Sequence, residues 1–286
     1  MAGATCGTLW VVATPIGNLG DLPPRAAEVL RAADAVVAED TRRTSRLFAH
    51  LGAPAPPLLS LPAFDERGRV AALVERLAAG QALALCTDAG TPGLSDPGAA
   101  LVAAAWAAGA RVIPVPGPSA ALAALSASGL PADRFLFAGF LPRKGGGRAE
   151  ALARLAALDC TAVLYEAGNR TAATLRDLAE ALGDRDALVA RELTKLHEEL
   201  RRGTLAELAA GLEGAEVLGE VTLVVGPPRP GAAAVPAAPA AEPLEAELAR
   251  RLAAGEPPSA LAREVARARG LKRSDVYAAI ERLKGR

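Results

Sequence analysis

Residues 81–98, QALALCTDAGTPGLSDPG, decide the fold class of this 286-residue chain. The apolar run Gln81–Cys86 is followed at once by the loop Thr87–Gly98, which contains three glycines and two prolines in twelve residues. A short apolar run that ends in Gly and Pro is typical of a buried strand leading into a loop. Small residues at Ala89, Gly90 and Gly93 would let the backbone of this loop approach a ligand closely.

The sequence on either side repeats this strand-and-loop pattern. Further apolar strands are predicted at residues 8–13, 35–38, 58–61 and 111–115. Helices are predicted between them at residues 24–33, 66–79 and 97–108. Strands separated by helices of this length indicate a parallel sheet with both faces covered.

Three more loops follow predicted strands: TPIGNLGD at Thr14–Asp21, AEDTRR at Ala38–Arg43 and PGPSA at Pro116–Ala120. The carboxyl ends of parallel strands lie at one edge of the sheet, where ligands bind. We therefore expect the four loops to form one ligand site. Each loop taken alone is more typical of a plain turn, and AEDTRR alone is more typical of the capped start of a helix.

The chain is predicted to contain four segments. An N-terminal α/β domain (1–128) precedes a second α/β domain (129–226), whose strands are expected at residues 135–140, 161–165, 188–191 and 220–225. A Pro/Ala linker (227–243) leads to a small helical basic domain (244–286). This tail has ten basic and six acidic residues, a net charge of +4 against −4 for the rest of the chain. The asymmetry indicates an anionic partner for the tail, and the alternative is a helical unit that only packs on the body of the protein or on a second copy.

Composition excludes several classes of protein. Hydrophobic residues make up 51% of the chain and charged residues 22%, which is typical of a folded globular protein. Three scattered cysteines and only two histidines, His50 and His197, argue against a disulfide framework or a metal site. Neither G-x-G-x-x-G nor G-x-x-x-x-G-K-[ST] occurs, so dinucleotide and P-loop sites are unsupported. No secretory signal or membrane span is evident, and we expect a reduced, cytoplasmic protein.

Five stretches together resemble one bacterial family, the ribosomal RNA small subunit methyltransferase I family. They are residues 9–48, 84–98, 115–120, 133–144 and 190–208, and they include TPIGNL, EDTR and DAGTP. The resemblance implies a two-domain α/β fold like that of the tetrapyrrole methylases (class III methyltransferases), with a small C-terminal helical domain. It also implies methylation of the 2′-oxygen of a cytidine in the 16S rRNA decoding centre. S-adenosyl-L-methionine would be the methyl donor, and no metal would be needed. The resemblance further implies that the protein is a homodimer and that its partner is the small ribosomal subunit.

One motif departs from the family pattern. Where members read close to YESPHR, this chain has YEAGNR at residues 165–170. The amide of Asn169 replaces an imidazole, which puts a titrating role at this position in doubt and leaves a hydrogen-bonding role open.

The resemblance also implies the site residues. The donor would lie against the loops that follow the strands of the first domain, with the second domain closing the pocket. The implied contacts are Pro15, Gly17, Asp88, Gly90, Thr91, Leu94, Ser95, Ser119, Ala120, Tyr165 and Leu193. Asp88 is equally consistent with a cap of its own loop.

Glu39 and Asp40 are the candidate catalytic carboxylates. Glu39 is favoured as the base that accepts the ribose proton, with a structural ion pair as the equal alternative. Asp40 would point the opposite way along the strand and pair with Arg42 or Arg43. The candidate RNA contacts are Arg42, Arg43, Arg143, Lys144, Lys272 and Arg273, with Arg148 and Arg269 in the same basic stretches.

Two other functions remain open from the sequence. The first is a tetrapyrrole-type C-methyltransferase acting on a small molecule, although such enzymes usually carry a more Gly-rich first loop and have no use for a basic tail. The second is a protein that binds RNA or the donor without catalysis.

Overall fold

The computed structural model describes residues 6–229, 243–269 and 271–284 of the chain. The chain divides into two compact units, Met1–Ala127 with Glu192–Glu199, and Ser128–Arg191 with Leu200–Arg286. Residues 230–242 of the predicted linker 227–243 lie outside the described residues. None of the described helices is long and apolar enough to cross a membrane.

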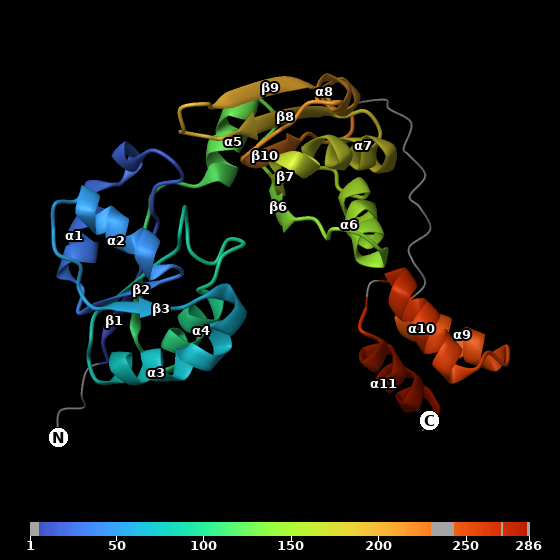
Figure 1. Cartoon of the computed structure of the whole chain (residues 1–286), viewed down its shortest axis with the longest axis horizontal. Coiled ribbons are helices and arrows are strands. Elements are labelled where there is room, and N and C mark those ends of the chain that lie inside the picture. The colour runs from blue at the N-terminus through green and yellow to red at the C-terminus, as the bar shows by residue number, and fades with distance from the viewer. Residues whose placement is uncertain (1–5, 230–242, 270, 285–286) are drawn as a thin grey trace. The chain divides into compact units, whose positions relative to one another are not determined.

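The first unit is built on a five-stranded sheet in the order β3-β2-β4-β1-β5 (Figure 1). Its strands are β1 (Thr8–Val12), β2 (Ala35–Ala38), β3 (Leu58–Ser60), β4 (Leu83–Cys86) and β5 (Arg111–Val115). Every pairing between them is parallel. The prediction of a parallel sheet is therefore confirmed.

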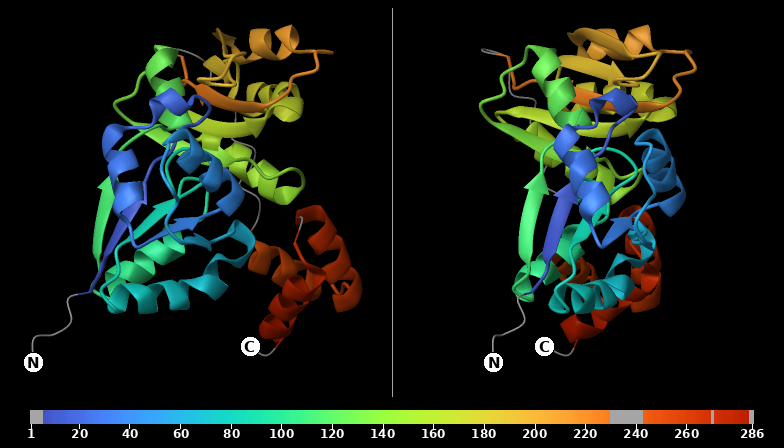
Figure 2. Two further views of the ribbon diagram at one scale, coloured as in Figure 1. Left: turned by 60° about the vertical axis from the view of Figure 1, so that its left-hand side comes forward. Right: turned by 90° about the vertical axis from the view of Figure 1, so that its left-hand side faces the viewer.

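Alternation along these strands gives the sheet two apolar faces. On β2, Val36 and Ala38 pack with α1 (Pro24–Ala32) and α2 (Thr41–His50), as part of one buried cluster. Ala35 and Val37 point to the opposite cluster, where α3 (Glu66–Ala78) and α4 (Ala99–Ala107) cover the sheet. Figures 1 and 2 show helices on both sides of the sheet. Both faces are thus covered, and the loops at the strand ends remain for the site.

Two short 3-10 turns and one further helix complete this unit. The turns are η1 (Leu19–Asp21) and η2 (Ala63–Asp65), and α5 (Ala120–Ser128) follows the PGPSA loop. Helix α2 was not among the predicted helices. Asp40 caps it by accepting a hydrogen bond from the backbone N–H of Arg42, so the capped-helix interpretation of AEDTRR is correct.

The second unit contains a mixed sheet in the order β6-β7-β10-β8-β9. Its strands are β6 (Phe135–Phe140), β7 (Thr161–Ala167), β8 (Asp186–Arg191), β9 (Glu199–Thr204) and β10 (Glu220–Val225). β10 runs antiparallel to β7 and β8, whereas β6 and β7 are parallel. Edge strand β9 was not predicted. Three helices pack on the core of this unit, α6 (Gly146–Ala156), α7 (Thr171–Leu182) and α8 (Leu205–Gly211), and η3 (Gly168–Arg170) precedes α7.

The tail is helical, as the sequence predicts, and its described residues form three helices. They are α9 (Leu244–Ala253), α10 (Pro258–Arg269) and α11 (Arg273–Lys284). Their shared apolar face is fully buried at Leu248, Leu261, Val265, Val276 and Ile280. α10 also packs on α6, where the backbone of Arg269 approaches Gly146 so closely that a Cβ there would lie 2.9 Å from the Arg269 Cα. The small core of the tail is thus extended by contact with α6.

Candidate active site

Three of the predicted loops are joined by hydrogen bonds at the carboxyl edge of the first sheet. Thr14, after β1, and Gly90, after β4, exchange two backbone hydrogen bonds of 2.9 and 3.0 Å. The Thr91 hydroxyl donates to the carbonyl oxygen of Pro118, after β5, over 3.2 Å. The structure therefore brings together the β1, β4 and β5 loops that the sequence nominates.

The β4 loop has an unusual backbone conformation. Gly90 has φ +80°, and a Cβ there would lie 3.4 Å from the side chain of Ile16. Ser95, a non-glycine residue, has φ +67°. L residues adopt this left-handed conformation rarely, and such residues are concentrated at binding sites. Leu94 and Ser95 are exposed, whereas Pro15 in the neighbouring β1 loop is buried.

Two buried hydroxyl oxygens at this edge have no hydrogen-bond partner among the described residues. They are Oγ1 of Thr87, the first residue of the β4 loop, and Oγ of Ser119, just before Ala120 begins α5. Leaving a buried polar group unsatisfied costs about 1–3 kcal/mol. These two atoms are therefore suited to accept or donate a hydrogen bond to a polar ligand that enters the loops.

A pair of partly buried carboxylates lies beside these loops. Glu39 follows β2, and its Oε2 accepts a hydrogen bond from the backbone N–H of Asp88 over 3.3 Å. Asp88 follows β4, and its Oδ1 accepts from the backbone N–H of Asp40 over 3.1 Å. Burial raises the pKa of both Glu39 and Asp88. For Glu39, the hydrogen bond from the Asp88 N–H opposes this rise, and the negative charge of Asp88 adds to it. The edge between β2 and β4 thus holds two carboxyl groups that are better proton acceptors than ordinary ones.

Asp40 is in a different environment. Its carboxylate caps α2 and pairs with the Arg42 guanidinium at 2.7 Å. Hydrogen bonds from Arg42 lower the pKa of Asp40 to about 2. Asp40 therefore stays ionised and engaged, and pairs with Arg42 as expected, whereas Arg43 pairs with Asp88 at 3.3 Å.

The structure corrects the placement of Leu193. The sequence assigned it to the second domain, but the segment Glu192–Glu199 belongs to the first unit. The backbone N–H of Asn18 donates to the Thr194 hydroxyl over 3.0 Å. A Cβ at Gly17 would lie 3.1 Å from the Leu193 carbonyl oxygen and 2.5 Å from the Lys195 side chain. Only a glycine in the β1 loop permits this approach, so Leu193 lies against Gly17 through its backbone.

Tyr165 lies in the second unit on β7. Its ring packs edge-on against Phe137, with 5.0 Å between the centroids, and contacts Phe140 at 5.7 Å. In the same motif, the Glu166 carboxylate is buried and accepts a hydrogen bond from the Thr174 hydroxyl over 2.7 Å, while Asn169 is exposed on η3. Because Asn169 is exposed, the packing of this unit does not require an imidazole at its position.

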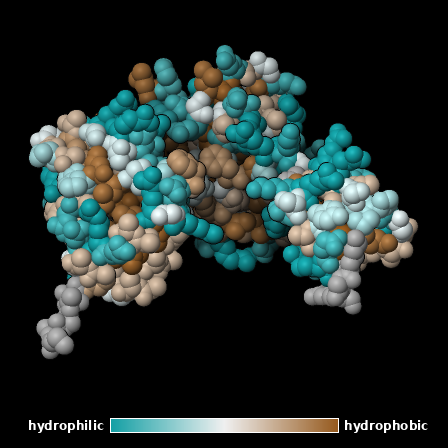
Figure 3. Space-filling view, turned by 60° about the horizontal axis from the view of Figure 1, so that its bottom comes forward, coloured by the Kyte–Doolittle hydropathy of each residue, from teal (hydrophilic) through white to brown (hydrophobic). Residues whose placement is uncertain are grey.

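The candidate RNA contacts divide into cations with exposed side chains and cations with largely buried ones. Arg42 and Arg43 are 87% and 63% exposed in their side chains. Four more are exposed in the loop before α6 and at the start of α11, namely Arg143, Lys144, Lys272 and Arg273. Hydrophilic residues cover much of the tail on the face displayed in Figure 3.

Arg148 and Arg269 are largely buried and paired within the protein, whereas the sequence placed them among the candidate RNA contacts. Arg148 is only 11% exposed, pairs with Asp177 at 2.6 Å and donates to the Thr174 hydroxyl over 3.0 Å. Arg269 is 15% exposed and pairs with Glu247 at 2.6 Å. Both guanidiniums therefore hold helices together, and neither is available as a free phosphate contact.

Within the described part of the chain, no group of three or more His, Cys, Asp or Glu residues could hold a metal ion.

The chain contains an α/β domain with a parallel sheet and loops gathered at its carboxyl edge, followed by an α/β domain with a mixed sheet. This is the fold class of the class III methyltransferases. The sequence profile described as Tetrapyrrole (Corrin/Porphyrin) Methylases matches residues 8–209. The chain belongs to this methylase family and, within it, to the ribosomal RNA small subunit methyltransferase I family. The family resemblance seen in the sequence is thereby confirmed.

Two relatives and one solved structure illustrate this. A ribosomal RNA small subunit methyltransferase I from Xylella fastidiosa is 55% identical over 206 residues, covering 72% of this chain and 75% of its own. The protein of that name from Mesorhizobium japonicum is 44% identical over 282 residues, covering 96% and 92%. Uroporphyrin-III C-methyltransferase from Thermus thermophilus, complexed with S-adenosylhomocysteine, shares the fold with a TM-score of 0.54 at 22% identity, covering 77% of this chain and 97% of its own.

Proposed function

We propose that this protein methylates the 2′-oxygen of a cytidine ribose in the decoding centre of 16S rRNA, with S-adenosyl-L-methionine as the methyl donor. Membership of the rRNA methyltransferase family supports the substrate class. The observation that carries the chemistry is the partly buried Glu39 carboxylate, whose pKa is raised, beside the loops of the first sheet. A ribose hydroxyl is a weak acid, so its methylation is helped by a base of this kind.

The loops at the carboxyl edge fit such a donor. The Thr87 and Ser119 hydroxyls are buried without a partner among the described residues, and Gly90 keeps the backbone clear of side-chain bulk. When bound, the donor supplies a methyl group already activated on a sulfonium. The residues proposed to hold it are Pro15, Gly17, Asp88, Gly90, Thr91, Leu94, Ser95, Ser119 and Ala120, with Leu193 from the segment against Gly17 and Tyr165 from the second unit.

The chain itself has two tasks in this reaction, alignment and proton removal. Alignment of the reacting groups by a rigid loop edge supplies much of the acceleration in such a transfer. Glu39 accepts the proton of the 2′-hydroxyl as the oxygen–carbon bond forms and the carbon–sulfur bond of the donor breaks, with S-adenosylhomocysteine as the leaving group. Asp88 acts on Glu39 through its backbone N–H, which fixes the carboxylate, and through its charge, which raises the pKa of Glu39.

The exposed cations are proposed to hold the RNA. Arg42 and Arg43 lie in the first turn of α2, close behind Glu39 in the sequence, so phosphates near the acceptor ribose would meet them first. Arg143 and Lys144 before α6, and Lys272 and Arg273 at the start of α11, would bind more distant phosphates of the small subunit. The homodimeric state and cytoplasmic location implied by the family resemblance form part of the same proposal.

Transfer of a tritiated methyl group to three acceptors tests this function. Purified protein and labelled donor would be mixed with small ribosomal subunits, with free 16S rRNA or with a tetrapyrrole. We expect label in the RNA-containing acceptors alone. Label in the tetrapyrrole would favour the small-molecule C-methyltransferase, and label in none of the three would favour a binding protein.

A further inference from the structure

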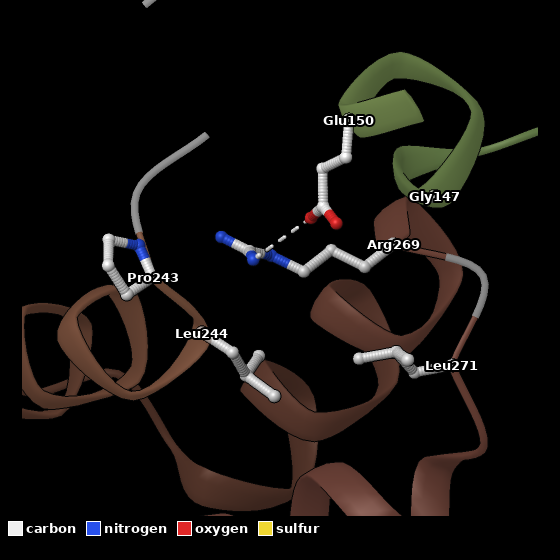
Figure 4. A pocket seen from close by; sticks show the side chains of 6 residues that line it. All are labelled: Gly147, Glu150, Pro243, Leu244, Arg269 and Leu271. Carbon is white, nitrogen blue, oxygen red and sulfur yellow. Dashed lines mark ion pairs between the residues drawn. The ribbon is translucent and has the colours of Figure 1, made fainter. Parts of the chain in front are cut away.

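A pocket of about 450 Å³ lies in the second unit, where the start of α6 meets the tail. Six residues line it, from α6, the start of α9 with the residue before it, the end of α10 and the turn that follows α10, as Figure 4 shows: Gly147, Glu150, Pro243, Leu244, Arg269 and Leu271. The volume falls within the range of pockets that bury small organic ligands, and a nucleoside fits such a space. All six lining residues belong to the second unit, so the pocket is distinct from the loop edge of the first sheet.

The walls combine apolar surface with one polar pair. Pro243, Leu244 and Leu271 offer the apolar contacts that flat aromatic rings need. Arg269 and Glu150 lie next to each other in the pocket lining, with 3.8 Å between Nη1 and Oε1 (Figure 4). Because that pairing is long and the Glu150 side chain is 41% exposed, its carboxylate oxygens can accept further hydrogen bonds.

The charges in and around the pocket favour a base over a phosphate. Arg269 is already paired with Glu247 at 2.6 Å, so one guanidinium faces two carboxylates. An additional anion would be repelled there, whereas a ligand with N–H donors would be attracted. Exposed cations flank the pocket on both sides in the sequence: Lys144 precedes Gly147, and Lys272 follows Leu271. Phosphates of a bound strand can pair with these cations while a base enters between them.

We propose that this pocket binds an unstacked guanine of the RNA substrate, with Glu150 accepting from its N–H groups. Guanine matches best because its ring N–H and its exocyclic amine lie on one edge and can donate to one carboxylate together, which no other RNA base can do. The RNA identity of the ligand rests on the proposed function, but none of the residues proposed for catalysis lines the pocket. It would contribute to substrate recognition and take no part in methyl transfer.

Short labelled oligoribonucleotides test the proposal on the full-length protein without donor. The probes are fluorescein-labelled UUGUU, UUAUU, UUCUU and UUUUU, titrated by anisotropy at one salt concentration. UUGUU should bind at least about tenfold more tightly than UUUUU, which is the gain expected from a hydrogen bond to a charged acceptor. The Glu150→Gln variant should lose this preference and bind UUUUU as before. Leu271→Ala, which removes one wall in an exposed turn, should weaken binding of UUGUU most.

Glu213→Gln is the matched control, because Glu213 is an exposed carboxylate of the same unit, 3.9 Å from Arg176. It should keep the full preference for UUGUU. Equal affinity for all four probes, or a preference that survives Glu150→Gln, would overturn the proposal. Methyl transfer into small subunits, measured on the same preparations, separates the two proposals. Methyl transfer without a preference for UUGUU would overturn only the guanine-pocket proposal. A preference for UUGUU without methyl transfer would overturn only the proposed methyltransferase function.

Discussion

Replacing Glu39 with Gln removes the proposed base and changes little else. The Gln side-chain carbonyl can still accept from the Asp88 N–H, which lies 3.3 Å from the carboxylate in the wild-type protein. The substitution also removes the repulsion of the Glu39 carboxylate by Asp40 and Asp88, whose negative charges raise the pKa of Glu39. The folded state should therefore be at least as stable as that of the wild type. Because general-base catalysis contributes roughly 10²–10⁴-fold, kcat should fall at least about tenfold, equivalent to about 1.4 kcal/mol or more in the barrier.

The assay is methyl transfer into small subunits at saturating donor, with calorimetry for donor affinity and thermal unfolding for stability. Asp40→Asn is the matched control, since it neutralises the next residue and Asn can still cap α2. It should keep kcat within about threefold of the wild type, well short of the loss expected of a base. A Glu39→Gln variant that retains wild-type kcat and loses thermal stability would refute the base assignment and leave Glu39 as a structural residue.

Asp88, the β4 loop and the tail each give a further prediction. Asp88→Asn should move the acid limb of the kcat–pH profile to lower pH. The reason is that the Asp88 charge raises the pKa of Glu39 and that the base works only when deprotonated. An acid limb at the wild-type pH would contradict the coupling between Asp88 and Glu39. Thr91→Arg should abolish donor binding, measured by calorimetry, and leave the thermal unfolding transition unchanged. The arginine side chain would fill the loop that the Thr91 hydroxyl links to Pro118 by a hydrogen bond. Unchanged donor affinity would show that this loop is not part of the donor site. Truncation after Pro243 should leave donor affinity intact, weaken small-subunit binding and flatten its salt dependence. The slope of the logarithm of the binding constant against the logarithm of the salt concentration should change by roughly 0.7 for each phosphate of single-stranded RNA that the tail neutralises. An unchanged KM at physiological salt would contradict docking by the tail.

The fold of the first unit was readable from the sequence because its strands are short, largely apolar runs followed by loops rich in Gly, Pro or charged residues. Helix α2 escaped prediction because polar and charged residues dominate TRRTSRLFAH, although Thr44, Leu47 and Phe48 form a buried stripe at helical spacing. Strand β9 escaped for a different reason. Its sequence ELRRGT lies at the edge of the sheet and contains no buried residue, so it has no apolar alternation to detect.

The composition of the site was readable, but its couplings were not. Glu39 and Asp88 lie 49 positions apart, and only the adjacency of β2 and β4 brings the carboxylate of one to the backbone of the other. No local pattern reports that pairing. The environment of Arg148 was equally hidden, because Arg143, Lys144 and Arg148 look alike in the sequence and only Arg148 faces Asp177 on α7. Leu193 was misplaced because its segment follows β8 of the second unit in sequence but packs with the first unit.

The most direct test of the proposed function is the identity of the modified nucleoside. Small subunits lacking the modification would be incubated with the protein and S-adenosyl-L-methionine, and their 16S rRNA digested to nucleosides and to defined oligonucleotides for mass spectrometry. We predict one new methyl group per subunit, recovered as 2′-O-methylcytidine in a decoding-centre fragment and absent with Glu39→Gln. A methyl group on a base, on another nucleotide or outside the decoding centre would contradict the proposed reaction.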